Sequence, residues 1–313
     1  MRLLFAGSPA IALPTLDALH PAFDVCGILT NPDRPSGRGR QSAETDVSLR
    51  ARTLGIPLLK PERLDGEARD AVRRLSPELL VVVAYGRIFG PKFLGLFPKG
   101  AVNLHPSLLP KYRGPSPIPA AILAGDAQSG VTVQRLSLKM DAGDILLQKV
   151  IPLSGIETTQ SLTEEAACIG AGMMVEVISN LDRLAGRPQD ESAASYCRLV
   201  GKDDGRVDWR RSAVEIDRMV RAYFPWPEAR TIFRGSGLQI LEAVPVPAGL
   251  EPSVVVPAPP GSVVGVDNHL GILVQTGDGL LALRKLKLQS KKALNWKDFL
   301  NGVHDFIGSD LGG

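Results

Sequence analysis

The first two-thirds of the chain alternate short apolar runs with segments of helical periodicity. Residues 2–7, 24–31 and 78–86 are predicted to be buried strands, and the last of these is apolar on both faces, as central strands of parallel sheets are. Residues 129–137 and 145–153 alternate apolar and polar positions, which is typical of a hairpin or of strands at a sheet edge. The pattern therefore predicts a sheet with a buried centre and an amphipathic edge.

Helical patterns separate these strands. The first predicted helix has Ser8 as its N-cap and Pro9 at its first helical position. Residues 45–55 form a second helix that ends on Gly55, and residues 161–187 form a long third helix. Strands that alternate with helices in this way predict an α/β fold with a parallel, doubly wound sheet.

The pattern changes near residue 190. Residues 190–207 are polar and are interpreted as a linker, and one short helix follows over residues 212–223. Four short strands separated by glycine turns come next, and the chain closes with a helix that has Asn295 as its cap. We therefore expect a catalytic domain over residues 1–189, a linker over 190–207, and a small β-barrel, OB-like, over 208–313.

Composition narrows the class of protein without naming it. The chain has 313 residues, of which 44% are hydrophobic and 22% charged, as in ordinary globular proteins. It contains no run of eighteen apolar residues and no signal-peptide pattern, so a cytoplasmic protein without a membrane anchor is expected. The three cysteines lie far apart, which argues against a zinc site or a disulfide framework. The net charge of +3 permits a nucleic-acid partner but does not require one.

Two polar residues stand near the end of an otherwise apolar strand. Asn103 and His105 are two positions apart in residues 101–105, so their side chains share one face of the strand, roughly 7 Å apart along it. Open α/β sheets bind ligands beyond the carboxyl ends of their strands. There an amide can stabilise a developing oxyanion, and an imidazole can move protons near neutral pH.

A carboxylate is needed to orient the imidazole and to favour its charged form. Asp141 and Asp144 both lie in a glycine-containing turn between two predicted strands, and the pattern alone does not choose between them. An Asn, His and Asp set without a nucleophilic side chain is suited to acyl transfer onto an amine that the substrate itself supplies. A structural pair at a strand end and an ordinary turn carboxylate are the alternatives.

Several motifs together resemble a known family. The stretch NLHPSLLPKYRGPSPI (103–118) is similar to the folate-binding signature of the formyltetrahydrofolate-dependent formyltransferases, and MDAGDIL (140–146) to their second motif. Further matches fit the branch of the family that acts on methionyl-tRNA. They are FAGSP (5–9), TNPDRPSGRGR (30–40), VVAYGRI (82–88), DDGRVDW (203–209) and RAYFPWP (221–227).

The resemblance carries specific expectations. It implies a Rossmann-like formyltransferase domain, and catalytic roles for Asn103, His105 and Asp141. It implies transfer of a formyl group from 10-formyltetrahydrofolate to the α-amine of methionine on initiator tRNA. No metal is expected, and a monomer is expected. The resemblance also implies that the folate site is lined by Ser107, Leu108, Leu109 and Pro110.

Two departures from the family pattern are present, and two other functions compete. Pro106 stands where glycine is common, and Pro119 where a glutamine-like residue is common, so a polar contact from position 119 is in doubt. One competing function is formyl transfer to a small amine, such as a nucleotide sugar or a purine precursor. The other is RNA binding on a catalytically inactive scaffold, against which the complete Asn, His and Asp set argues.

Basic residues gather in two places. The segment RKLKLQSKK on the late predicted strand has five basic residues and no acid, and a Gly/Pro-rich loop after the second strand holds three arginines. Small barrels often bind nucleic acid on one face, and two such clusters favour tRNA binding over a merely solvated surface. The expected tRNA-binding residues are Arg34, Arg38, Arg40, Arg284, Lys285, Lys287, Lys291 and Lys292.

Overall fold

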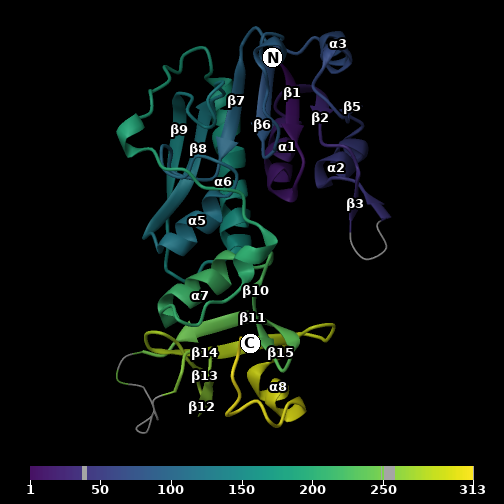
Figure 1. Ribbon diagram of the computed structural model, residues 1–313. Helices are drawn as coiled ribbons and strands as arrows, with labels where there is room; N and C mark the ends of the chain where they lie inside the picture. The colour runs from purple at the N-terminus through teal and green to yellow at the C-terminus, as the bar shows by residue number, and fades with distance from the viewer. Residues whose placement is uncertain (37–40, 248, 250–257, 313) are drawn as a thin grey trace. The chain divides into compact units, whose positions relative to one another are not determined.

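The computed structural model describes residues 1–36, 41–247, 249 and 258–312 (Figure 1). It divides into two compact units. Unit 1 contains Met1–Pro117, Gln128–Pro152 and Leu162–Arg198, and unit 2 contains Ile118–Ala127, Leu153–Ser161 and Leu199–Gly313. Two short segments that flank a hairpin of unit 1 therefore belong to unit 2. Arg38 and Arg40 lie outside the described residues.

Unit 1 is built on a seven-stranded sheet, which Figure 1 shows fanning from β9 to β5. The first five strands of the order run parallel, β8 is antiparallel to β7, and β9 is antiparallel to β8. The predicted parallel sheet and its amphipathic edge hairpin are thus confirmed. The strands, in sheet order, are β5 (Leu58–Leu59), β2 (Asp24–Leu29), β1 (Arg2–Gly7), β6 (Leu79–Val83), β7 (Ala101–His105), β8 (Gln128–Arg135) and β9 (Ile145–Pro152).

The helices of unit 1 begin and end where local chemistry requires. The Thr45 hydroxyl accepts a hydrogen bond from the Ser48 amide at the start of α2, and Gly55, with φ of 68°, ends that helix as predicted. A two-stranded hairpin precedes α2. The elements are η1 (Ala10–Ala12), α1 (Leu13–Leu19), β3 (Arg34–Ser36), β4 (Gln41–Ala43), α2 (Asp46–Leu54), α3 (Gly66–Leu75), α4 (Pro91–Leu94), and α6 (Thr159–Ser179), of which the first three residues belong to unit 2.

The predicted capping role of Ser8 is wrong. Its hydroxyl oxygen accepts hydrogen bonds from the Asn31 side chain at 2.9 Å, the Asn31 amide at 3.2 Å and the Thr30 hydroxyl at 3.3 Å. The Asn31 side chain also donates to the Tyr85 carbonyl at 2.8 Å. Ser8 therefore ties the carboxyl ends of β1, β2 and β6 together, and the chain after it begins with the short η1 turn instead of a capped α-helix.

The long helix α6 ends at Ser179, eight residues before the predicted end. Arg187 exchanges two backbone hydrogen bonds with Ile145, at 2.8 and 2.9 Å, and this bridge requires extended backbone. Pairing with the sheet edge thus outweighs helix propensity over residues 180–187. The segment that follows, interpreted as a linker, contains the two short turns η2 (Glu191–Ala193) and η3 (Lys202–Gly205).

Unit 2 is built on a six-stranded antiparallel sheet, and both of its predicted helices are confirmed. Ser212 caps α7 in a capping box with Glu215, and the Asn295 side chain caps α8. The described elements, with the strands first in sheet order, are β10 (Ala229–Phe233), β11 (Ser236–Pro245), β14 (Leu280–Leu288), β13 (Gly271–Gln275), β12 (Val263–Asp267), β15 (Leu294–Asn295) on β14, α5 (Pro117–Ala124), α7 (Ala213–Ala222) and α8 (Trp296–Gly302).

A closed barrel is not confirmed. In the described part of unit 2, β10 and β12 are the ends of the sheet path and do not pair with each other. The C-terminal residues occupy both edges instead: the Gly308 amide donates to the Val263 carbonyl at 2.8 Å, and the Gly312 amide to the Ile232 carbonyl at 2.9 Å. Because these bonds satisfy edge groups that closure would otherwise satisfy, the sheet stays open.

The close approach of α6 to β7 depends on a glycine. A Cβ atom on Gly170 would lie 2.6 Å from Cδ2 of Leu104, which is buried between Asn103 and His105 in the sequence of β7. Gly172, two residues along the same helix, is exposed and has no atom within 4 Å of the same position. The two glycines of one helix thus differ only in what faces them.

We predict that Gly170→Val destabilises the protein by about 1–3 kcal/mol, because the added methyl groups overpack the Leu104 side chain. Gly172→Val is the matched control, and its effect should be within about 0.5 kcal/mol because the position is open to solvent. Thermal unfolding of both variants followed by circular dichroism measures the difference. Equal melting temperatures for the two variants would contradict this account of helix packing.

Candidate active site

The carboxyl end of β7 brings His105 into a nearly water-free position. His105 is 5% exposed. Its partner across the sheet is Thr132 on β8, and the residue before it, Leu104, is paired with Val83 on β6. The apolar residues of β7 bury the strand on both faces, and the two polar side chains interrupt that pattern only at its end. The predicted placement of Asn103 and His105 at a carboxyl edge of the sheet is confirmed.

Two hydrogen-bond acceptors face the imidazole of His105. Nε2 lies 2.9 Å from the Tyr112 carbonyl oxygen, which can only accept, so the proton of the neutral ring resides on Nε2. Nδ1 lies 3.8 Å from Oδ2 of Asp141. Burial lowers the pKa of His105, and the Asp141 charge and the Tyr112 carbonyl oppose that effect without cancelling it. The ring is therefore a neutral base whose free lone pair faces a carboxylate.

Asp141 is held in a defined orientation. Its Oδ2 accepts a hydrogen bond from the Gly114 amide at 2.8 Å, and its Oδ1 accepts one from the Gln134 side chain at 3.1 Å. Its backbone is left-handed, with φ of 49°. Asp144, the alternative, packs against Gly186, so Asp141 is the carboxylate that faces His105.

The amide of Asn103 is available to a ligand. Its side chain is half-buried, and it makes no hydrogen bond to any part of the chain that the structure describes. A half-buried amide costs free energy when it is unpaired, so its donor group favours a partner from solution. Asn103 and His105 therefore present a donor and a base from the same strand.

The loop after β7 is fixed mainly by Thr132 of β8. The Thr132 hydroxyl donates to the Ser107 carbonyl at 2.7 Å and accepts from the Leu109 amide at 3.2 Å, and the Ser107 hydroxyl donates to the Lys111 carbonyl at 2.7 Å. Ser107 and Leu109 are buried, whereas Leu108 and Pro110 are partly exposed. Of the four residues expected at the folate site, two hold the loop and two face outward in part.

Four residues around Asp141 were not found from the sequence. Arg113, Gln134, Gln189 and Glu191 form a polar network beside it, and Arg113 has no exposed surface at all. The guanidinium of Arg113 lies against the Gln189 and Glu191 side chains, and together with Lys139 it lowers the pKa of Glu191 to about 2. An arginine in a Lys-Tyr-Arg step suggests a surface position, so only the fold could reveal this network.

The basic cluster of unit 2 lies on β14 and the turn after it. Lys285 is paired with Glu242 at 3.2 Å, and the Arg284 side chain donates to the Leu270 carbonyl. The other three ammonium groups have no partner among the described residues, and their side chains reach solvent at least in part: Lys287, Lys291 and Lys292. In unit 1, Arg34 is exposed at the start of β3.

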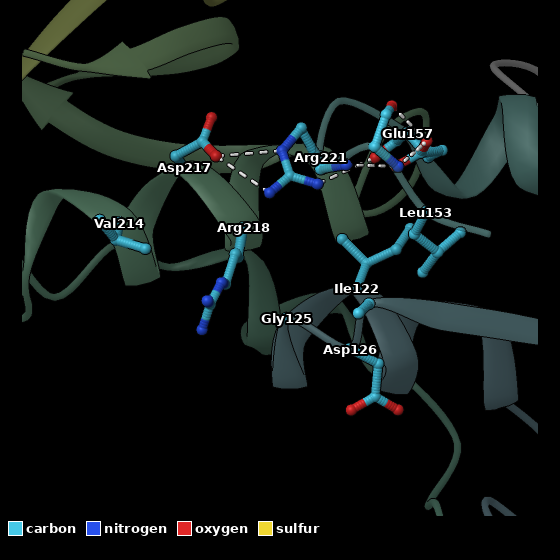
Figure 2. A pocket seen from close by; sticks show the side chains of 12 residues that line it. Ile122, Gly125, Asp126, Leu153, Glu157, Val214, Asp217, Arg218 and Arg221 are labelled. Carbon is cyan, nitrogen blue, oxygen red and sulfur yellow. Dashed lines mark hydrogen bonds and ion pairs between the residues drawn. The ribbon is translucent and has the colours of Figure 1, made fainter. Parts of the chain in front are cut away.

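A cavity of about 300 Å³ lies within unit 2, between α5, α7 and the turn at residues 153–157. Figure 2 shows that Arg221, one of the two arginines that line it, is already engaged. The Arg221 guanidinium binds Asp217 at 3.0 Å and donates to the Glu157 carbonyl at 3.1 Å. Burial raises the pKa of Asp217 in spite of Arg221. The cavity thus holds one arginine that is paired with a carboxylate and a second, Arg218, whose guanidinium lies 3.5 Å from the Ala124 carbonyl oxygen.

Two family models match almost the whole chain. Residues 3–178 match the model described as formyl transferase, and residues 199–304 match that of the formyl transferase C-terminal domain. The chain belongs to the formyl transferase family. Curated relatives named methionyl-tRNA formyltransferase agree at full length. The protein of Treponema denticola is 44% identical over 98% of each chain, and that of Chloroflexus aggregans is 42% identical over 97% of this chain and 98% of its own.

Solved structures of formyl transferase relatives share the fold. WlaRD, a sugar 3N-formyl transferase crystallised with dTDP and 5-N-formyl-THF, matches 93% of this chain and 99% of its own, with a TM-score of 0.65 and 18% identity. HypX from Aquifex aeolicus in complex with tetrahydrofolic acid matches 98% of this chain and 48% of its own, with a TM-score of 0.61 and 17% identity. At these identities the likeness concerns the fold.

No described helix is long and apolar enough to cross a membrane.

We predict that His105 titrates below the ordinary histidine value of about 6.5, and that Asp141→Asn lowers its pKa further. Burial disfavours the imidazolium, and the substitution removes the charge that partly offsets burial. The chain has only four histidines, so NMR titration of their ring protons can resolve His105. Asp144→Asn is the control and should leave the pKa of His105 unchanged. A rise of the His105 pKa in Asp141→Asn would contradict the pairing.

Proposed function

We propose that this chain transfers the formyl group of 10-formyltetrahydrofolate to the α-amine of methionine carried by initiator tRNA. The observation that carries the proposal is the full-length identity of 44% to a relative named for that substrate. In this chain His105 and Asp141 face each other, and Asn103 precedes His105 on the same strand. Each of these residues has a role that its geometry supports. The product is formylmethionyl-tRNA, with which translation can start.

His105 and Asp141 handle the proton in the proposed reaction. The amine nitrogen attacks the formyl carbon, a new C–N bond forms, and the bond to the folate nitrogen then breaks. Nδ1 of His105 accepts the proton that the amine loses and returns it to the departing folate nitrogen. The resulting imidazolium lies between two acceptors, the Tyr112 carbonyl and the Asp141 carboxylate, and both favour its charge.

Asn103 stabilises charge on the formyl oxygen. As the amine adds, the carbonyl oxygen becomes an oxyanion, and the unpaired amide of Asn103 donates to it. Because that amide has no other partner among the described residues, it need not break a hydrogen bond to do so. A donor of this kind lowers the activation barrier by about 2.7–4 kcal/mol.

The proposed folate site begins at the loop after β7. Leu108 and Pro110 are partly exposed beside the reactive end of the strand and can contact the planar co-substrate, while buried Ser107 and Leu109 keep the loop in shape. This position is the carboxyl edge of the sheet, where α/β folds bind ligands. We assign the folate donor to this edge and assign no metal to the reaction.

Binding of tRNA is assigned to the two basic clusters. Lys287, Lys291 and Lys292 carry unpaired charge, Arg284 and Lys285 extend the row, and Arg34 adds charge in unit 1 together with Arg38 and Arg40 outside the described residues. We propose catalysis in residues 1–189, a linker over 190–207 and tRNA binding in 208–313, acting as a monomer. For the last domain we propose a barrel-like form in which the sheet itself stays open and the C-terminal residues bond to both of its edges.

The assay that tests the function combines the protein with 10-formyltetrahydrofolate and either charged initiator tRNA or a small amine acceptor. We expect formylmethionine on the tRNA and no product from a nucleotide amino sugar. Product from the small amine alone would favour the alternative acceptor. Binding of tRNA without any formyl transfer would favour an inactive RNA-binding scaffold.

Two substitutions at the end of β7 should depress turnover without unfolding the protein. We predict that Asn103→Ala lowers kcat by about 10²–10³-fold, through loss of the oxyanion donor, and that His105→Ala lowers it by about 10²–10⁴-fold, through loss of the base. The initial rate of formylmethionine formation at saturating substrates measures kcat for both variants. Asp144→Asn, in the same turn as Asp141, should retain turnover. An Asn103→Ala enzyme with full kcat would remove this residue from the mechanism.

The unpaired lysines should affect tRNA binding and not turnover. We predict that Lys287→Gln raises the KM for tRNA, leaves kcat at saturation, and reduces the slope of log affinity against log salt by about 0.7–0.9. Lys92→Gln on α4, an exposed cation outside both clusters, is the control. Steady-state kinetics at two salt concentrations measures the KM for tRNA and kcat separately for each variant. A loss of kcat with unchanged KM would contradict a phosphate-binding role.

A further inference from the structure

One segment, which begins one residue before the interpreted linker and includes its first part, contacts both acceptors that face His105. We call this segment, Gln189–Cys197, the strap. It belongs to unit 1 and lies against the Tyr112 loop on one side and the Asp141 turn on the other. Its contacts are hydrogen bonds of both backbone and side chains, and its sequence position is more than forty residues from Asp141.

On the Tyr112 side, the strap pairs with the loop much as a strand would. The Arg113 amide donates to the Ser195 carbonyl and the Cys197 amide to the Arg113 carbonyl, both at 2.8 Å. The Ser195 hydroxyl accepts from the Tyr112 amide at 2.9 Å. Tyr112 has a φ of 58°, which is costly for a bulky residue, so its carbonyl stays aimed at His105 only while these bonds hold it.

A glycine makes this approach possible. Gly114 has a φ of 117°, and a Cβ atom there would lie 2.3 Å from the Cys197 carbonyl oxygen. The amide of the same glycine donates to Asp141. One residue therefore allows the strap to come close and also binds the carboxylate.

On the Asp141 side, the first contact of the strap is the side-chain amide of Gln189. Nε2 of Gln189 lies 2.9 Å from the Asp141 carbonyl, 2.7 Å from the Gly143 carbonyl and 3.2 Å from Oε1 of Gln134. Gln134 in turn donates to the Asp141 carboxylate. The amide thus contacts the backbone of the turn and the side chain that orients its carboxylate.

Arg113 fixes which way the Gln189 amide points. Its Nε and Nη2 donate to Oε1 of Gln189 at 3.0 and 2.9 Å, so Nε2 must face the Asp141 turn. Glu191 accepts from Arg113 at 2.8 Å and from Lys139 at 2.5 Å, and Lys139 lies two residues before Asp141. A buried cation therefore orients the amide, and a carboxylate of the strap binds the same turn a second time.

We propose that Gln189 is a positioning residue that sets the place of the Asp141 carboxylate beside His105. The proposal rests on the proposed formyl transfer for its kinetic consequence, but its geometric content concerns the free protein. Asp141 is in a left-handed conformation, and a turn that loses the three contacts of Nε2 relaxes toward a more ordinary backbone. The carboxylate then recedes from Nδ1.

The charges around His105 make the position of Asp141 measurable. Asp141 is the carboxylate that faces the ring, the Cys197 thiol lies near the Tyr112 and Arg113 carbonyls, and the Arg113 charge is turned toward Gln189 and Glu191. Displacement of Asp141 removes the charge that favours the imidazolium. A role of the strap in stability alone would leave the titration of His105 unchanged in the folded protein.

The first experiment is an NMR titration of the free protein. We expect Gln189→Leu to lower the pKa of His105 in the same direction as Asp141→Asn does. Gln189→Glu, which keeps an oxygen for Arg113 but loses the donor, serves as a second variant if the first fails to fold, and its kcat is the readout. Asp190→Asn is the matched control, because among the described residues Asp190 bonds only to Ser192 and Ala193 within the strap. An unchanged or raised His105 pKa in folded Gln189→Leu would overturn the proposal.

The second experiment is a double-mutant cycle in formyl transfer. Gln189→Leu should lower kcat by about tenfold or more while both KM values stay within about twofold, because a misplaced group affects the reacting geometry. In an Asp141→Asn background the same change should cost less than about twofold, since both residues act through one carboxylate. Fully additive losses would overturn the proposal. If the wild-type protein forms no formylmethionine, the proposed function fails, and the NMR titration still decides the position of Asp141.

Discussion

The chemistry of this site depends on the imidazole of His105, which is buried, is neutral at rest and faces two hydrogen-bond acceptors. Water is nearly excluded from His105, so the neutral ring is favoured. The Tyr112 carbonyl faces Nε2, however, and the Asp141 carboxylate faces Nδ1, and both favour the charged ring. Burial and electrostatic attraction oppose each other, and their balance keeps the ring able to take up a proton transiently. A wetter site would lose this balance, because water would weaken the effect of Asp141.

The backbone around His105 must therefore be held against its own preferences. Tyr112 and Asp141 both adopt left-handed conformations, and neither is a glycine. Their neighbours in the sequence do not enforce this. Thr132 and Gln134 of β8 hold the two loops from the sheet, and the strap holds them from the other side. The backbone of the site is thus held by polar residues of the amphipathic edge hairpin and of the strap.

Periodicity made the strands and the pair on β7 predictable, because Asn103 and His105 interrupt an apolar run at its end. It could not reveal contacts that join distant segments. Ser8 has the sequence of an N-cap but bonds to Asn31 across the sheet. Arg113 reads as a surface residue and is fully buried, because Gln189 and Glu191 come from a polar stretch that looks like a linker. The barrel was expected from strand spacing, which says nothing about whether edges pair with each other or with a terminal segment.

The gap of 3.8 Å between Nδ1 and Oδ2 has a consequence for the chemistry. It is longer than a hydrogen bond, so Asp141 acts on the ring through its charge while Nδ1 keeps a free lone pair. Oδ2 is already bonded to the Gly114 amide, and Oδ1 to Gln134, which limits how far the carboxylate can swing toward the ring. A carboxylate held closer would fix the proton on Nδ1 and leave no base for an amine. A carboxylate released by its donors would leave the imidazolium without a counter-charge. The donors on Asp141 therefore matter to proton transfer as much as Asp141 itself.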